Sequence, residues 1–84
     1  MNKLNDQELE KVSGGTISQD EALAKALEHA KLSKDQVDFV KKVEMDYEHG
    51  RKIYEVELYK GGFEYEFEID AENGGILKYK KEWD

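Results

Sequence analysis

From about Val40 to the C-terminus, apolar and polar residues alternate with a period of two, the pattern of strands that bury one face. Short segments rich in glycine, asparagine or aspartate separate four such stretches and predict turns at His49-Gly50, at Gly61-Gly62 and at residues 70–75. The pattern therefore predicts a four-stranded antiparallel sheet with one apolar and one charged face. The apolar face is expected to carry Val43, Met45, Tyr47, Tyr54, Val56, Leu58, Phe63, Tyr65, Phe67, Ile69, Leu77, Tyr79 and Trp83.

The turn lengths also predict a register, because a slip of one residue would move each side chain to the wrong face. This register gives two favourable glutamate–lysine pairs on the charged face and two unfavourable glutamate pairs. The apolar pairs are Leu58 with Tyr65, Val56 with Phe67, Tyr54 with Ile69, Ile69 with Leu77, and Phe67 with Tyr79. The charged pairs are Glu68 with Lys78, Glu66 with Lys80, Glu57 with Glu66, and Glu55 with Glu68.

In the segment before the strands, apolar residues recur every three or four positions, which is the spacing of a helix. Ser18 has the character of an N-cap and Glu21 that of its capping-box partner. A second cap-like sequence at residues 33–36 predicts the start of a short second helix or a turn through Val37 and Phe39. The predicted fold is α+β: one main helix plus a short second helix packed on the apolar face of the sheet. The residues of the main helix that recur at helical spacing are Ala22, Leu23, Ala26, Leu27 and Ala30.

The segment before the helix, residues 1–15, has a different character. On a helix, its apolar residues fall within an arc of about 140°, and two glycines follow them. This pattern resembles the double-glycine leader of bacterial peptides that leave the cell through ABC exporters with their own cysteine peptidase domain. The resemblance implies binding to the exporter peptidase domain and cleavage after the second glycine. The residues concerned are Leu4, Glu8, Leu9 and Val12 for recognition, and Gly14 and Gly15 for cleavage.

A segment this short is not a stable helix alone, so the leader is expected to be disordered until it is bound. The alternative is an ordinary N-terminal helix that packs on the domain and is followed by a glycine linker. The expected organisation is a leader at residues 1–15 and one domain at residues 16–84.

The region after the leader resembles a PepSY domain. The resemblance rests on residues 17–22, residues 53–58 and residues 63–77, and the last segment follows the pattern Tyr-x-x-x-Ile-Asp-Ala-x-x-Gly-x-Ile/Val. Gly75 departs from the glutamate or lysine that the family often has there. The resemblance implies a helix on an antiparallel sheet, no catalytic residues, and a role in inhibiting or regulating peptidases.

Composition excludes several kinds of chemistry. The net charge of −7 argues against nucleic acid and anionic membranes as partners, and no apolar run is long enough for membrane insertion. The chain has no cysteine, so it has neither disulfides nor a thiol nucleophile. His29, expected on the polar side of the helix, and His49, expected in a turn, have no paired spacing. We therefore expect no metal, no cofactor and no enzymatic activity.

The charged face of the sheet is the one surface whose pattern points to a partner. Its ordinary role would be solubility. The sharper hypothesis is a docking surface for a basic protein, whose binding would relieve the mutual repulsion of the carboxylates. The edge strands could also pair into a dimer or accept a peptide strand, so a monomer or weak dimer is expected. The candidate residues are Glu44, Asp46, Glu48, Glu55, Glu57, Glu64, Glu66 and Glu68.

Together these features predict a protein made in the cytoplasm and exported, processed after Gly15, that binds and inhibits or regulates a peptidase outside the cell. One alternative is a bacteriocin-like secreted effector, although membrane-active peptides are usually cationic and amphipathic. The other is a cytosolic protein-binding module whose N-terminus only mimics a leader.

Overall fold

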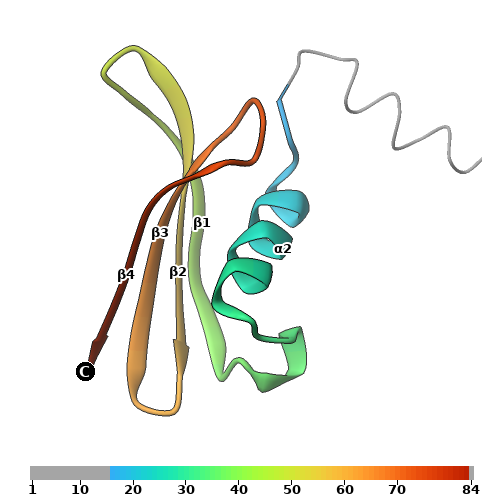
Figure 1. The fold of residues 1–84 in the computed structure, drawn as a ribbon, viewed down its shortest axis with the longest axis vertical. Helices are drawn as coiled ribbons and strands as arrows, with labels where there is room; N and C mark the ends of the chain where they lie inside the picture. The colour runs from blue at the N-terminus through green and yellow to red at the C-terminus, as the bar shows by residue number, and fades with distance from the viewer. Residues whose placement is uncertain (1–15, 84) are drawn as a thin grey trace, which may run out of the picture.

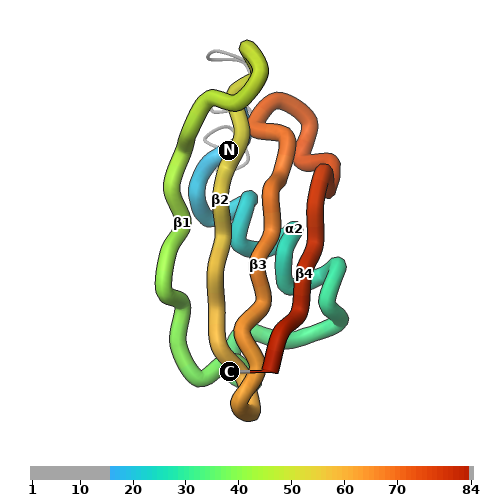
Figure 2. The backbone as a smooth tube through the Cα atoms, turned by 90° about the vertical axis from the view of Figure 1, so that its left-hand side faces the viewer, coloured from blue at the N-terminus to red at the C-terminus, as the bar shows by residue number. Residues whose placement is uncertain are grey.

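The computed structural model describes residues 16–83, which form one α-helix and one four-stranded sheet (Figure 1). The order along the sheet is β1-β2-β3-β4 with every neighbouring pair antiparallel, so hairpins join all the strands. Figure 2 shows the sheet from one side with the helix behind it. This confirms the predicted α+β arrangement of a helix on an antiparallel sheet. The elements are α2 (Gln19–Ala30), β1 (Phe39–Glu48), β2 (Arg51–Lys60), β3 (Phe63–Asp70) and β4 (Ile76–Trp83).

The helix begins where the capping box was predicted. The Glu21 amide donates to Ser18 Oγ at 3.1 Å, and the Ser18 amide donates to Glu21 Oε1 at 3.0 Å. These bonds satisfy two of the amides that the first turn leaves without an intrahelical partner. Ala22 and Ala26 are fully buried, and their small side chains let the helix lie close to the sheet.

The core lies between the helix and the two central strands. The sheet contributes the alternate positions that the sequence assigned to the apolar face of β2 and β3, and α2 contributes Ala22, Ala26 and Leu27. The predicted register between β2 and β3 is confirmed. The apolar positions of the edge strands are different, because one helix does not cover the full width of the sheet: Met45 is 41% exposed and Tyr79 40%. Burial of the central residues supplies the main hydrophobic stabilisation.

The predicted second helix is wrong. Residues Lys34–Gln36 form a single 3-10 turn, and Val37 is already extended. The Asp38 amide donates to the Tyr59 carbonyl at 2.8 Å, which draws the chain into the sheet directly after the turn. Pairing with β2 therefore stops the helix that the cap-like sequence would otherwise begin.

Irregularities in both edge strands change which side chains reach the charged face. In β1 the register shifts between Val40 and Lys42, and in the β3–β4 pair it shifts between Glu68 and Ile69. The second shift pairs Ile69 with Ile76, so the predicted pairing of Ile69 with Leu77 is wrong. Leu77 instead borders a hollow of about 360 Å³ together with the buried Ile53, on the face turned away from the helix. An extra residue in one strand reverses the alternation beyond it.

Candidate functional site

The sheet surface opposite α2 is called the acidic face below. The register places the predicted carboxylates there, on three neighbouring strands. Glu44 pairs with Glu55 and Glu55 with Glu68, so one row of carboxylates crosses three strands. The predicted pair of Glu57 with Glu66 also forms. Such rows of like charge destabilise a sheet unless cations compensate them. The carboxylates of this face are Glu44, Asp46, Glu48, Glu55, Glu57, Glu64, Glu66 and Glu68.

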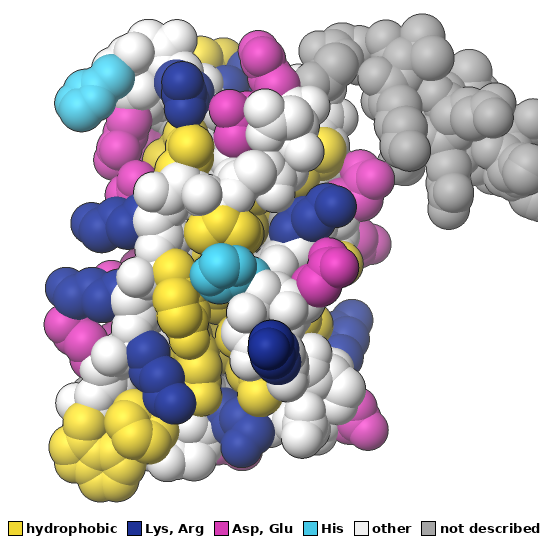
Figure 3. All heavy atoms as spheres, viewed as in Figure 1, with side chains coloured by type: hydrophobic (Ala, Val, Ile, Leu, Met, Phe, Trp, Pro, Cys, Tyr) yellow, Lys and Arg dark blue, Asp and Glu magenta, His cyan; other side chains and the backbone are white. Residues whose placement is uncertain are grey.

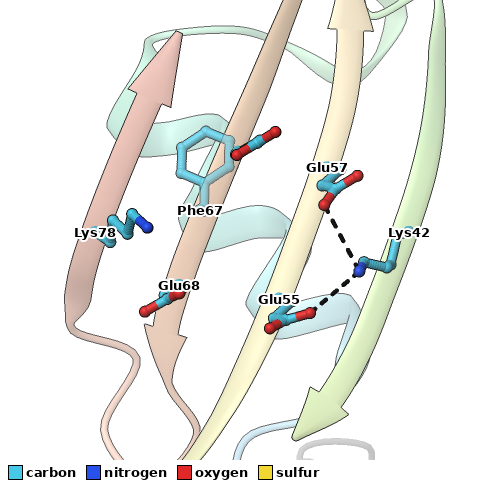
Figure 4. Close-up of a pocket in the computed structure, with 7 residues that line it drawn as sticks. Lys42, Glu55, Glu57, Phe67, Glu68 and Lys78 are labelled. Atoms are coloured by element: carbon cyan, nitrogen blue, oxygen red, sulfur yellow. Dashed lines mark hydrogen bonds and ion pairs between the residues drawn. The ribbon is translucent and has the colours of Figure 1, made fainter. Parts of the chain in front are cut away.

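Two lysines of β1, Lys41 and Lys42, supply part of the compensation, and Figure 4 shows Lys42 beside Glu55 and Glu57. Lys42 Nζ lies 3.1 Å from Glu55 Oε1 and 3.6 Å from Glu57 Oε2. The hydrogen bond to Glu55 raises the pKa of Lys42. Lys41 Nζ lies 3.6 Å from Glu57 Oε1 and 4.0 Å from Glu64 Oε2. The electrostatic interaction with Tyr59, and then that with Glu57, raises the pKa of Lys41. Both ammonium groups hold the glutamates of β2 against the sheet.

The sequence-based reasoning missed Lys41 and Lys42, because strict alternation puts only one of two consecutive lysines on this face. The β1 irregularity at Lys41 lets both side chains reach it. The spacing of Val40 and Val43 was an available signal. Two apolar residues three positions apart cannot share a face of a regular strand, so they indicate an extra residue between them.

On the other side of the face, β4 contributes a second set of lysines. Lys78 pairs with Glu68 and Lys80 with Glu66, which confirms the two predicted cross-strand pairs. The Lys80 ammonium makes its closest ion pair with Glu82, at 3.0 Å, and this hydrogen bond raises the pKa of Lys80. The acidic face therefore carries lysines on both edge strands, and on β1 they lie beside the carboxylates of Glu44, Asp46 and Glu48.

The centre of this face is hollowed, with a volume of about 300 Å³. Four glutamates from β2 and β3 border the hollow, and Lys42 and Lys78 stand on opposite sides of it (Figure 4). A lysine or arginine side chain of a partner entering here would meet carboxylates from both strands, the chemistry of charge-assisted hydrogen bonds. The glutamates are Glu55, Glu57, Glu66 and Glu68.

Within residues 16–83, two groups of carboxylates lie close enough to be considered for a metal ion. Their oxygens lie within 4.8 Å of one another in each group. Oxygen ligands suit calcium or magnesium. In one group, however, the Lys41 ammonium already contacts two of the carboxylates and would compete with a cation. The expectation of no metal stays a prediction. The groups are Asp46, Glu48 and Glu55, and Glu57, Glu64 and Glu66.

His29 does not lie on a purely polar side of the helix, as the sequence suggested. Its ring is 4.9 Å from the Tyr79 ring and 6.4 Å from the Phe67 ring, both in edge-to-face geometry. The imidazole therefore packs against the aromatic side chains of β3 and β4.

The loop at residues 70–75 forms the predicted turn. Asp70 Oδ1 accepts the Glu72 amide at 2.8 Å, and Asn73 Oδ1 accepts the Gly75 amide at 2.7 Å. These side-chain oxygens are used within the loop, which is the way Asx residues stabilise turns.

The beginning of the described chain is fastened to the sheet. The Ile17 amide donates to the Ala71 carbonyl at 2.7 Å, and the Tyr54 hydroxyl donates to the Ile17 carbonyl at 2.8 Å. These bonds fix the backbone two positions after Gly15. The predicted leader residues, Leu4, Glu8, Leu9, Val12, Gly14 and Gly15, lie outside the described residues.

Among the described residues, no helix is long and apolar enough to span a bilayer. Comparisons of the chain with curated proteins and with solved structures gave no significant match. Residues 16–80 match the family described as "Peptidase propeptide and YPEB domain", called PepSY. This match spans the helix and nearly the whole sheet, and it agrees with the resemblance noted in residues 17–22 and 63–77. The chain therefore belongs to the PepSY family.

Proposed function

We propose that this chain is an exported precursor. An exporter peptidase domain recognises residues 1–15 and cleaves after Gly15, and the released domain acts outside the cell as a non-catalytic regulator or inhibitor of a peptidase. The observation that carries the proposal is a coincidence of boundaries: the family match begins at Thr16, directly after the Gly14-Gly15 pair. Ile17 donates a backbone hydrogen bond to Ala71 directly after the end of β3, and the expected cut after Gly15 leaves this contact in place.

The proposed contact with the peptidase is the acidic face. The row Glu44, Glu55 and Glu68 and the pair Glu57 and Glu66 keep like charges close together. A basic partner surface would relieve this repulsion, and most of the gain would come from electrostatic attraction. Such binding weakens as salt shortens the range of the attraction. The proposal therefore requires a strong dependence of binding on ionic strength.

The export step is tested by the intact mass of the protein in the medium and in the cells of the producing bacterium. The expected secreted species begins at Thr16. A Gly14→Val/Gly15→Val variant should remain uncleaved, because side chains at these positions block a narrow peptidase channel. A control is Ala24→Val, which adds the same side chain at an exposed helix position and should leave cleavage unchanged. A full-length species confined to the cells would contradict the export proposal.

The acidic face is tested with culture medium from a strain that lacks this gene, using casein hydrolysis as the readout. Added wild-type protein should reduce hydrolysis, and Glu57→Lys/Glu66→Lys should reduce it less. The control is Glu28→Lys/Glu72→Lys, which makes the same charge change on the exposed helix surface and the β3–β4 loop. Equal inhibition by wild type and by the acidic-face variant would overturn the proposed contact.

A further inference from the structure

The exposed large hydrophobic side chains of residues 16–83 are confined to the two edge strands of the sheet. The helix and the central strands β2 and β3 have none. Scattered apolar residues on a surface are ordinary, but here they follow two strands that each pair on one side only. The residues are Phe39, Val40, Met45 and Tyr47 on β1, and Leu77, Tyr79 and Trp83 on β4.

On the acidic-face side both edges carry charges of both signs, but β1 is net negative, with Glu44, Asp46 and Glu48 beside Lys41 and Lys42, and β4 is net positive, with Lys78 and Lys80 beside Glu82. Two β1 strands paired antiparallel about Met45 would set Glu44 opposite Asp46, and two β4 strands paired about Tyr79 would set Lys78 opposite Lys80. Like charges directly opposite one another destabilise a strand pair, whereas unlike charges stabilise it. The charges favour the pairing of β1 with β4.

We propose that copies of this chain associate head to tail, with β1 of one copy pairing with β4 of the next. The strand order and the antiparallel neighbours mean that β1 and β4 run in opposite directions. A second copy placed beside the first, with its helix on the same side, therefore presents an antiparallel strand. The result is one continuous antiparallel sheet through both copies. This inference does not depend on export or on peptidase regulation.

One register satisfies both faces. Val43 and Tyr79 lie on the same row across the sheet, so a level arrangement would place them opposite each other, but it would also place Lys80 opposite Lys42. A shift of two residues keeps the faces matched and removes this conflict. It gives a methionine–aromatic contact on the helix side and three pairs of opposite charge on the other. The pairs are Tyr79 with Met45, Lys80 with Glu44, Lys78 with Asp46, and Glu82 with Lys42.

The helices leave room for this arrangement. Four strands are roughly 19 Å wide, whereas a helix with its side chains is about 10–12 Å across. Figure 3 shows hydrophobic side chains in a stripe between the sheet and α2, with lysine or arginine side chains beside it. Because the two paired strands are different, the contact is heterologous and repeats with each added copy unless the assembly closes into a ring.

The test uses the full-length chain and sedimentation equilibrium from about 10 μM to 1 mM, the range in which a weak association becomes visible. The average mass of the wild type should rise with concentration. Lys78→Glu/Lys80→Glu makes both edges acidic, and Glu44→Lys/Asp46→Lys makes both edges basic. Each variant alone should associate about tenfold more weakly or worse. An equimolar mixture should recover association, because each acidic edge then meets a basic one.

Circular dichroism and thermal melting of each variant separate loss of association from loss of fold. The milder Lys78→Gln/Lys80→Gln variant provides a second probe of the same edge. A wild-type chain that stays monomeric at about 1 mM would overturn the proposal. The proposal would also be overturned if the Glu44→Lys/Asp46→Lys variant associated as strongly as the wild type. That result would mean that copies pair through β4 alone. A mixture of two folded variants that stays monomeric would contradict the assigned pairing of β1 with β4.

Discussion

The hydrogen bond between the Tyr54 hydroxyl and the Ile17 carbonyl offers the most direct test of how the start of the domain is held. Tyr54 is 4% exposed, and its hydroxyl donates to that carbonyl at 2.8 Å. Tyr54→Phe keeps the buried ring and removes only the donor. The expected loss is about 1 kcal/mol of unfolding free energy at pH 7, because a neutral intramolecular hydrogen bond contributes roughly 0.5–1.5 kcal/mol net. The loss stays in this range because Ile17 is only half-buried, so its carbonyl can accept a hydrogen bond from water once the Tyr54 hydroxyl is removed.

Thermal and urea denaturation measure this loss. In a domain of this size, about 1 kcal/mol lowers Tm by roughly 4–8 °C. It also lowers the urea midpoint by about 0.5–1 M. Tyr47→Phe is the matched control, because Tyr47 is 66% exposed and should leave Tm unchanged. Equal melting of Tyr54→Phe and wild type would refute the argument that this bond fastens the N-terminal segment.

Comparison of the wild type with Tyr54→Phe also gives a prediction for alkaline pH. Burial, and then the charge of Glu21, raises the pKa of Tyr54 above that of a tyrosine in the unfolded chain. A raised folded-state pKa contributes stability that is fully present below about pH 10 and is lost as pH rises through the folded-state value. The wild type should therefore lose its advantage over Tyr54→Phe above pH 10. A constant difference in urea midpoint between pH 8 and pH 11 would contradict this linkage.

Three further predictions concern the helix cap, a hairpin glycine and the core. Ser18→Ala should lower stability by about 1 kcal/mol in urea denaturation, whereas Ser18→Asp should retain the cap. Gly62→Ala should lower the free energy of unfolding more than Gly50→Ala. Both glycines have positive φ, but only at Gly62 does the added Cβ lie 3.0 Å from the Trp83 ring. The fluorescence of the tryptophan should therefore also shift in Gly62→Ala. Leu58→Ala should cost about 2–5 kcal/mol in unfolding free energy, because Leu58 is fully buried, whereas the exposed Leu77→Ala should have little effect on the same measurement.

Much of the fold could be predicted from local patterns. The capping box depends on Ser18 and Glu21, which are three residues apart. The alternation along β2 and β3 is regular because each of these strands pairs with a neighbour on both sides and buries one face. Two-residue spacing at Gly61-Gly62 then sets the register between these strands. These signals work because each is enforced by nearby atoms. A prediction made from them needs no knowledge of distant contacts.

The edges of the sheet were harder to predict, because the alternation is no longer enforced by burial on both sides. The irregularities at Lys41 and at Leu77 each shift the pattern by one residue, and each adds a side chain to the acidic face. Strands without neighbours on one side tolerate such extra residues. The alternation therefore placed the glutamates of β2 and β3 on one face, as the register does, and missed the lysines of β1 that contact them.

The proposed association of copies would strengthen the proposed binding of a basic partner to the acidic face. Pairing of β1 with β4 would use the carboxylates of Glu44 and Asp46, but it would leave the central glutamates of β2 and β3 facing solvent. Neighbouring copies would then present these glutamates on one continuous surface. A partner with several basic sites gains avidity from such repetition without any new kind of contact. If both proposals hold, binding of a multivalent basic partner should strengthen as this protein is concentrated, whereas binding by the edge-reversed Lys78→Glu/Lys80→Glu variant should not.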